Sequence, residues 1–238
     1  MRTQPSTYLL IPGAWHGGWS WWPVARRLRA AGHRAVALTL PGLADGDDRA
    51  GLRLRDAVDH VIDEVQRREL TGVTLVGHSW AGYPMTAAAH RLADRISTMV
   101  YYNAQVPVPG GSMADDNPPE IAAFLRDLIE SAPDNAIPPT VEFVRQSFMQ
   151  DVAEDAQRLL AELLTPHPGA YFLDAPDVPD FAALGLPARY VLGEHDHALP
   201  RPGAEFAARL GLEPVMVAGT HEGMLTHPDA VADAILAA

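Results

Sequence analysis

Short apolar runs alternate with amphipathic segments along most of the chain. The runs are too short for helices and are typical of strands buried on both faces, as in a parallel sheet. The predicted strands are residues 7–11, 35–40, 73–76, 96–103, 188–192 and 214–217. Helical spacing of apolar residues or strong helix formers predict helices at 23–31, 52–69, 85–89, 205–210 and 228–236. This alternation predicts βαβ units, and so an α/β fold with a doubly wound, mostly parallel sheet.

The alternation of strands and helices stops at Pro107. Residues 107–183 contain eleven prolines and many acidic residues. Helical patterns occur at 120–131, 141–148 and 154–164, and we expect no buried strand there. We interpret 107–183 as a helical cap inserted into a core of residues 1–106 and 184–238. Its apolar helix faces are expected to cover the carboxyl edge of the sheet.

A serine lies at the turn between strand 73–76 and the helix that follows it. Residues 77–82 read GHSWAG, so Ser79 is flanked by small residues. This is the layout of a nucleophile elbow, in which the backbone at the serine is strained. A large side chain at Gly77 or Ala81 would collide with the neighbouring elements. A plain Gly-Ser loop also fits this motif. Whether Ser79 is a nucleophile therefore depends on a base and an acid that follow it in the right chain order.

Two later strand-end loops supply that acid and base. Asp196 follows strand 188–192, and His221 follows strand 214–217. The carboxyl ends of parallel strands meet at one edge of the sheet, and the order Ser, acid, His is that of α/β-hydrolases. We therefore predict Ser79 as nucleophile, His221 as general base and Asp196 as the residue that orients the imidazole.

The loop after the first strand completes the predicted site. It contains four of the five tryptophans, which makes Trp15 a candidate for the substrate-lining wall. The tetrahedral intermediate of acyl transfer carries an oxyanion, which two backbone N–H groups should meet. We predict the N–H of Trp80, directly after the nucleophile, and that of Ala14.

Several other polar residues near these loops compete with the triad or support it. Glu194 is the rival acid, and His227 is the alternative base. His195 and His197 flank Asp196, but without further ligands nearby they predict no metal site. The remaining candidates are assigned supporting places: His78 as a packing residue, His16 as a residue that could orient the tryptophan loop by a hydrogen bond, and Asn103 at a strand end where related enzymes can carry an acid.

Composition and charge narrow the function classes. The chain has 238 residues, 47% of them apolar, which is enough for one domain with an insertion. Its 30 acidic and 18 basic residues give a formal charge of −12, which argues against binding to nucleic acid or an anionic membrane. There is no cysteine, so disulfides, thiolate nucleophiles and cysteine metal sites are excluded. With no apolar run of 18 residues and no signal segment, we expect a cytoplasmic protein.

Three stretches resemble one known family. Residues 11–21 read IPGAWHGGWSW, residues 76–79 read VGHS, and residues 219–225 read GTHEGML. They are similar to the plant methyl-ester esterase and hydroxynitrile lyase family and to bacterial esterases related to it. The resemblance covers both ends of the core, is weak in the cap, and implies the α/β-hydrolase fold.

The same resemblance separates two branches of chemistry. The lyases of the family resemble one another in a threonine just after the first strand and a lysine just after the catalytic histidine. The matching residues here are Gly13 and Glu222, which favours ester hydrolysis. We therefore expect a serine hydrolase that cleaves a small or medium hydrophobic carboxylic ester through an acyl-enzyme on Ser79, without metal or organic cofactor. The alternatives are a hydroxynitrile lyase or other cofactor-free lyase, and a non-catalytic ligand-binding module.

Overall fold

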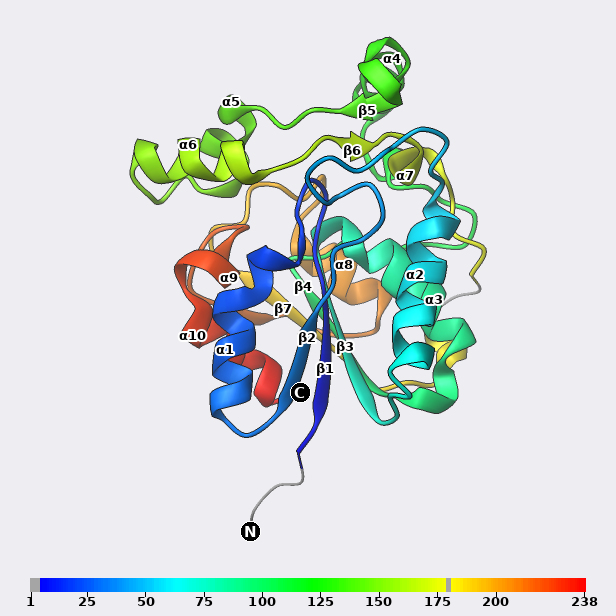
Figure 1. Cartoon of the computed structure of the whole chain (residues 1–238), viewed down its shortest axis with the longest axis vertical. Helices are drawn as coiled ribbons and strands as arrows, with labels where there is room; N and C mark the ends of the chain where they lie inside the picture. Colours follow the sequence, from blue (N-terminus) through cyan, green and yellow to red (C-terminus); the bar gives the residue numbers. More distant parts are fainter. Residues whose placement is uncertain (1–4, 179–180) are drawn as a thin grey trace.

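A computed structural model describes residues 5–178 and 181–238 of the chain. Within this range a six-stranded parallel sheet has the strand order β2-β1-β3-β4-β7-β8 (Figure 1). The strands are β1 (Thr7–Ile11), β2 (Arg34–Ala37), β3 (Val73–His78), β4 (Ile96–Tyr102), β7 (Ala188–Gly193) and β8 (Val215–Val217). The predicted α/β class and parallel sheet are confirmed.

Helices cover both faces of the sheet. Successive strand residues point to opposite faces, so Leu9 and Ile11 pack in one core layer and Tyr8 and Leu10 in the other. The first layer is covered by α2 (Leu54–Arg67), α3 (Gly82–Arg91) and α8 (Gly203–Arg209). The second is covered by α1 (Trp22–Ala30), α9 (Gly223–Thr226) and α10 (Pro228–Leu236) (Figure 1). None of the helices in the described part of the chain has the length and hydropathy of a membrane span.

Residues 107–183 are here called the cap segment, and its elements between Pro119 and Leu173 lie above the carboxyl ends of the strands (Figure 1). Its elements are α4 (Pro119–Ser131), β5 (Ala136–Ile137), α5 (Val141–Phe143), the π-helical turn Val144–Phe148, α6 (Glu154–Leu163), β6 (His167–Pro168) and α7 (Ala170–Leu173). The expectation that this segment has no buried strand was wrong, because β5 and β6 are both buried and pair antiparallel. These strands have two residues each and lie among prolines, so they leave no alternating pattern in the sequence.

Single turns of 3-10 helix connect several of these elements. They are Gly18–Trp21, Ser79–Ala81, Ala93–Arg95, Ala114–Asp116, Pro133–Asn135 and Phe181–Leu184.

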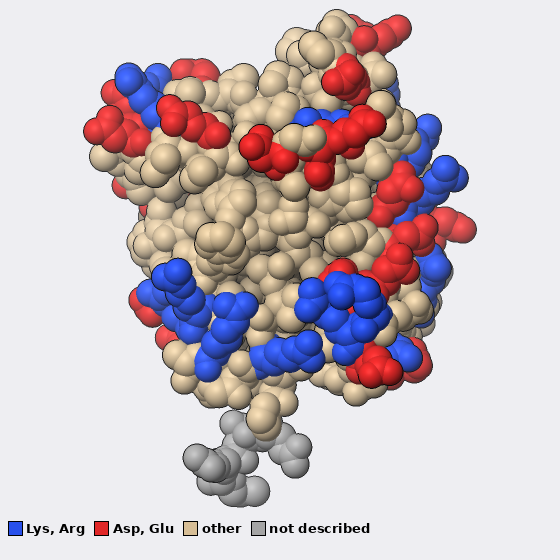
Figure 2. Space-filling model, in the orientation of Figure 1, with Lys and Arg blue, Asp and Glu red and all other residues tan. Residues whose placement is uncertain are grey.

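Charge is divided unequally between the cap segment and the core. The cap segment contains 14 of the 30 acidic residues and 3 of the 18 basic ones, so it carries −11 of the formal charge of −12. Figure 2 shows acidic side chains over the part of the molecule where the cap lies, and arginines gathered toward the opposite end of the sheet. The cap segment over the carboxyl edge of the sheet is therefore the more negative part of the molecule.

Candidate active site

Ser79 occupies a strained turn between β3 and α3. Its backbone φ is +56°, in the left-handed region that non-glycine residues rarely adopt. The turn is tight: a Cβ at Gly77 would lie 2.9 Å from the Met85 sulfur, and one at Gly82 would lie 1.8 Å from the Gln105 carbonyl oxygen. The predicted strained turn is present. Its tightest position is Gly82, where no side chain fits against the backbone of Gln105.

His221 and Asp196 meet at the same edge of the sheet. The His221 Nδ1 lies 2.8 Å from the Asp196 Oδ2, and the two side chains are 1% and 2% exposed. Burial lowers the pKa of His221, but the charge and hydrogen bond of Asp196 outweigh it, so the net shift is upward. Burial likewise raises the pKa of Asp196, but the charge of His221 reverses the shift. Each partner thus favours the ionised form of the other.

The alternative acid and base lie elsewhere. The side chain of Glu194 is exposed, and so are those of His195 and His197. The His227 Nδ1 lies 2.8 Å from the hydroxyl of its neighbour Thr226. The structure therefore brings neither alternative into the pair that His221 forms with Asp196.

The loop after β1 lies directly against the Ser79 turn. A Cβ at Gly13 would stand 2.9 Å from the Ser79 Cβ and 2.8 Å from the His78 Nδ1. Ala14, the next residue, is buried, and no hydrogen bond to its N–H is found among the described residues. Its carbonyl oxygen instead accepts from His16 Nδ1 at 2.7 Å, as the sequence suggested for His16. This places one predicted oxyanion donor beside the predicted nucleophile.

Trp15 ties this loop to the cap segment. Its φ is +66°, its N–H donates to His167 Nδ1 at 3.2 Å, and its indole N–H donates to the Ile137 carbonyl at 2.9 Å. The indole also lies 5.6–5.9 Å, between ring centroids, from three cap rings: Phe143, Phe148 and Phe172. The residue predicted to line the substrate space therefore lies at the junction of core and cap.

Other aromatic contacts at this junction were not predicted from the sequence. Phe148 stacks on the His221 ring at 5.0 Å. The Trp80 indole stacks on Tyr171 at 5.0 Å and donates to the Tyr171 carbonyl at 3.0 Å. No local signal marks these cap residues, because each reaches its partner only when the chain folds back over the sheet.

Two buried polar residues, Asn103 and His78, form hydrogen bonds to the backbone of the His221 loop. The Asn103 amide donates to the His221 carbonyl at 3.0 Å and accepts from the Gly193 N–H at 2.7 Å. The His78 Nε2 also donates to the His221 carbonyl, at 3.1 Å. Burial lowers the pKa of His78 to about 3, so this ring is neutral. Asn103 holds both the acid and the base loop, and His78 holds the base loop, so His78 does more than pack.

Three potential metal ligands lie close together in this centre. His78, His221 and Glu222 each have a ligand atom within 4.8 Å of the others. Each also has a protein partner: the His221 carbonyl for His78, Asp196 for His221, and His16 for Glu222. The groups therefore form a connected polar centre, and the absence of a metal requirement stays a prediction.

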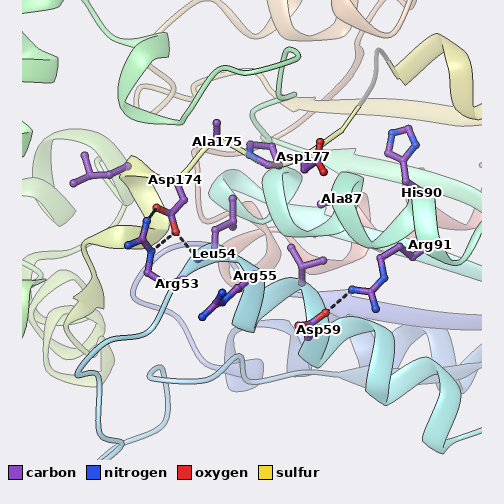
Figure 3. Close-up of a pocket in the computed structure, with 13 residues that line it drawn as sticks. Arg53, Leu54, Arg55, Asp59, Ala87, His90, Arg91, Asp174, Ala175 and Asp177 are labelled. Atoms are coloured by element: carbon purple, nitrogen blue, oxygen red, sulfur yellow. Dashed lines mark hydrogen bonds and ion pairs between the residues drawn. The ribbon is translucent and has the colours of Figure 1, made fainter.

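A charged cleft of about 860 Å³ lies away from this centre, between α2, α3 and residues 173–177 (Figure 3). Two of its three arginines are paired: Arg53 with Asp174, and Arg91 with Asp59. None of Ser79, Asp196 and His221 lines it. The cleft is large, but it lacks the predicted nucleophile, base and acid, so it is not the candidate active site.

Comparison with known proteins agrees with this fold. Residues 8–234 match the profile described as the alpha/beta hydrolase family, so the chain belongs to that family.

Individual relatives are esterases by name. A carbendazim-hydrolysing esterase from Nocardioides sp. (strain SG-4G) is 36% identical over 124 residues, which span 50% of this chain and 51% of that protein. Methylesterase 18 of Arabidopsis thaliana is 28% identical over 210 residues, 80% of this chain and 79% of that protein. An extracellular α/β-hydrolase from a Paenibacillus species has the same fold, with a TM-score of 0.91 and 23% identity over 98% of this chain and 99% of its own.

Proposed function

We propose that the protein is a serine hydrolase that cleaves a small or medium hydrophobic carboxylic ester through an acyl-enzyme on Ser79. The observation that carries the proposal is the buried pair of His221 and Asp196, 2.8 Å apart, at the same sheet edge as the strained Ser79 turn. A serine hydroxyl is a weak nucleophile, and such a pair is what activates it.

In the acylation step, the Ser79 oxygen attacks the ester carbonyl carbon while its proton passes to His221 Nε2. Asp196 holds His221 with the Nδ1 proton facing the carboxylate and stabilises the imidazolium that forms. The N–H groups of Ala14 and Trp80 receive the developing oxyanion. When the carbon–oxygen bond to the alcohol breaks, His221 returns its proton to the leaving oxygen.

Deacylation repeats the steps with water. His221 removes a proton from water, the hydroxide attacks the acyl carbon, and the Ser79 oxygen leaves with the proton from His221. The products are a carboxylic acid and free enzyme. At neutral pH the acid ionises, and the charge of the cap segment repels the carboxylate product.

Two features support a neutral, hydrophobic substrate. The junction of core and cap is rich in aromatic rings, which include Trp15, Phe143 and Phe148. The cap segment carries −11 of formal charge, which disfavours the approach of an anionic ester. The esterases named above are relatives of this chain, and their names agree with ester hydrolysis as the reaction.

The nucleophile is tested with a fluorophosphonate probe and a panel of short-chain aryl and methyl esters. We expect labelling and ester hydrolysis by the wild type, and loss of both in Ser79→Ala and His221→Ala. Equal labelling of the wild type and Ser79→Ala would place the nucleophile elsewhere. Ligand binding without turnover of any ester would favour the non-catalytic alternative.

The lyase alternative is tested in the same preparation. Cyanide leaves as an anion, and neither a cation nor a hydroxyl stands at Glu222 or Gly13. We expect clear hydrolysis of an activated aryl ester and no detectable cleavage of mandelonitrile. Cleavage of mandelonitrile that depends on Ser79, with esters left intact, would overturn the esterase proposal.

A further inference from the structure

His16 and Glu222 form a buried pair of side chains next to His221. The His16 Nε2 lies 3.3 Å from the Glu222 Oε1, and both side chains are 0% exposed. Burial raises the pKa of Glu222, but the facing imidazoles, His16 first among them, lower it to about 2. The carboxylate is therefore ionised at neutral pH.

The two ring nitrogens of His16 face Ala14 and Glu222. Its Nδ1 lies 2.7 Å from the Ala14 carbonyl oxygen, which can only accept, so Nδ1 carries a proton. Its Nε2 lies 3.3 Å from the Glu222 carboxylate. His16 thus donates one N–H to Ala14 and turns its other ring nitrogen toward Glu222.

The pair lies between the loop after β1, which contains the proposed oxyanion donor Ala14, and the loop of the proposed base His221. At one end, His16 fixes the peptide between Ala14 and Trp15, and Trp15 has the costly φ of +66° that needs such support. At the other end, Glu222 directly follows His221, and its N–H donates to the Phe148 carbonyl at 3.3 Å. The pair therefore connects the loop after β1, the His221 loop and the cap segment.

We propose that His16 and Glu222 are positioning residues, which hold the Ala14 N–H against Ser79 and keep a second negative charge beside His221 when its imidazolium forms. This inference rests on the proposed function. A buried ion pair is not by itself evidence of stability, because its desolvation offsets its attraction. Its value here lies in joining two loops that must stay in register within a fraction of an ångström.

The test removes the charge of Glu222 and keeps the size and shape of its side chain. In the full-length chain, Glu222→Gln should lower kcat for an aryl ester by about tenfold to 100-fold, with KM changed less than about twofold. The acid limb of the kcat/KM profile should also move to lower pH, because Glu222 helps to raise the pKa of His221. Glu194→Gln, an exposed change on the neighbouring Asp196 loop, is the matched control and should have wild-type values.

Other groups face His221 and stay in place in this experiment. Asp196 pairs with its Nδ1, the neutral His78 lies 4.5 Å away between ring centroids, and the uncharged Phe148 covers the ring. The Tyr102 hydroxyl is neutral, because burial raises its pKa well above the ordinary value. A shift of the acid limb in Glu222→Gln is therefore assigned to Glu222.

A second variant separates positioning from folding. If Glu222→Gln folds poorly, His16→Asn/Glu222→Gln replaces both members of the buried pair together, and it should fold while remaining as slow as the single variant. Rates are counted per active site labelled by fluorophosphonate. Wild-type kcat and an unmoved acid limb in either folded variant would overturn the inference, even if the melting temperature fell. A wild type that is neither labelled at Ser79 nor active on esters would instead refute the proposed function.

Discussion

Replacing Asp196 with asparagine tests the His221 pair most sharply. The asparagine side chain retains an oxygen that can accept from the Ala198 N–H, as the carboxylate does at 2.8 Å, so the loop should keep its shape. The new amide nitrogen would face His221 Nδ1 and force the ring proton onto Nε2, the atom that must receive the serine proton. At 2.8 Å and an effective dielectric constant of about 20, the lost attraction to the imidazolium is about 6 kcal/mol. That corresponds to a fall in kcat of roughly 10⁴-fold.

The assay is single-substrate kinetics on the aryl ester that the wild type hydrolyses best. Thermal unfolding of Asp196→Asn is measured alongside, to show that the fold is kept. Glu194→Gln provides the comparison and should lose less than about twofold, because its side chain is exposed and outside the pair. If Glu194→Gln were the slow variant and Asp196→Asn the fast one, the acid of the triad would be wrongly assigned.

Three further outcomes are expected. The acid limb of the wild-type kcat/KM profile should have its midpoint above about 6.5, since the base acts when neutral and Asp196 raises the pKa of His221; Asp196→Asn should move it to lower pH. Gly13→Ala should cut kcat by about 100-fold, because its Cβ would press on Ser79 and His78, and a normal rate would contradict the close approach of the two loops. Treatment with EDTA should leave ester hydrolysis unchanged; activity lost to EDTA and restored by zinc would point to a metal mechanism.

The core was predictable because its signals are local. A strand buried on both faces, such as Thr7–Ile11, is a continuous apolar run wherever it occurs. Asp196 and His221 could then be placed together, because parallel strands bring their carboxyl ends to one edge. The positions of Ser79, Asp196 and His221 after predicted parallel strands were therefore enough to predict that they lie close together.

The cap segment and its contacts were not predictable in this way. The Trp15 N–H meets His167 across 152 residues, and its indole meets Ile137 across 122. Nothing near Trp15 in the chain indicates these partners, and the strands that present them have two residues each. Asn103 shows the same difficulty at the sheet edge. Its lack of charge argued against an acid, but only the structure shows that it holds the loops of Gly193 and His221.

Glu222 and Gly13 carry unequal weight in the choice between ester hydrolysis and lyase chemistry. From the sequence, the carboxylate of Glu222 opposes a leaving cyanide through its charge. In the structure that carboxylate is fully buried, 3.3 Å from His16 and directly after His221, so it opposes cyanide through electrostatics alone. Gly13 acts through steric exclusion: the Cβ of any side chain there would stand within 3 Å of Ser79 and His78, so the position of the lyase threonine cannot hold a hydroxyl in this backbone. The stronger argument against cyanohydrin cleavage is therefore the close packing of the first loop on the serine turn.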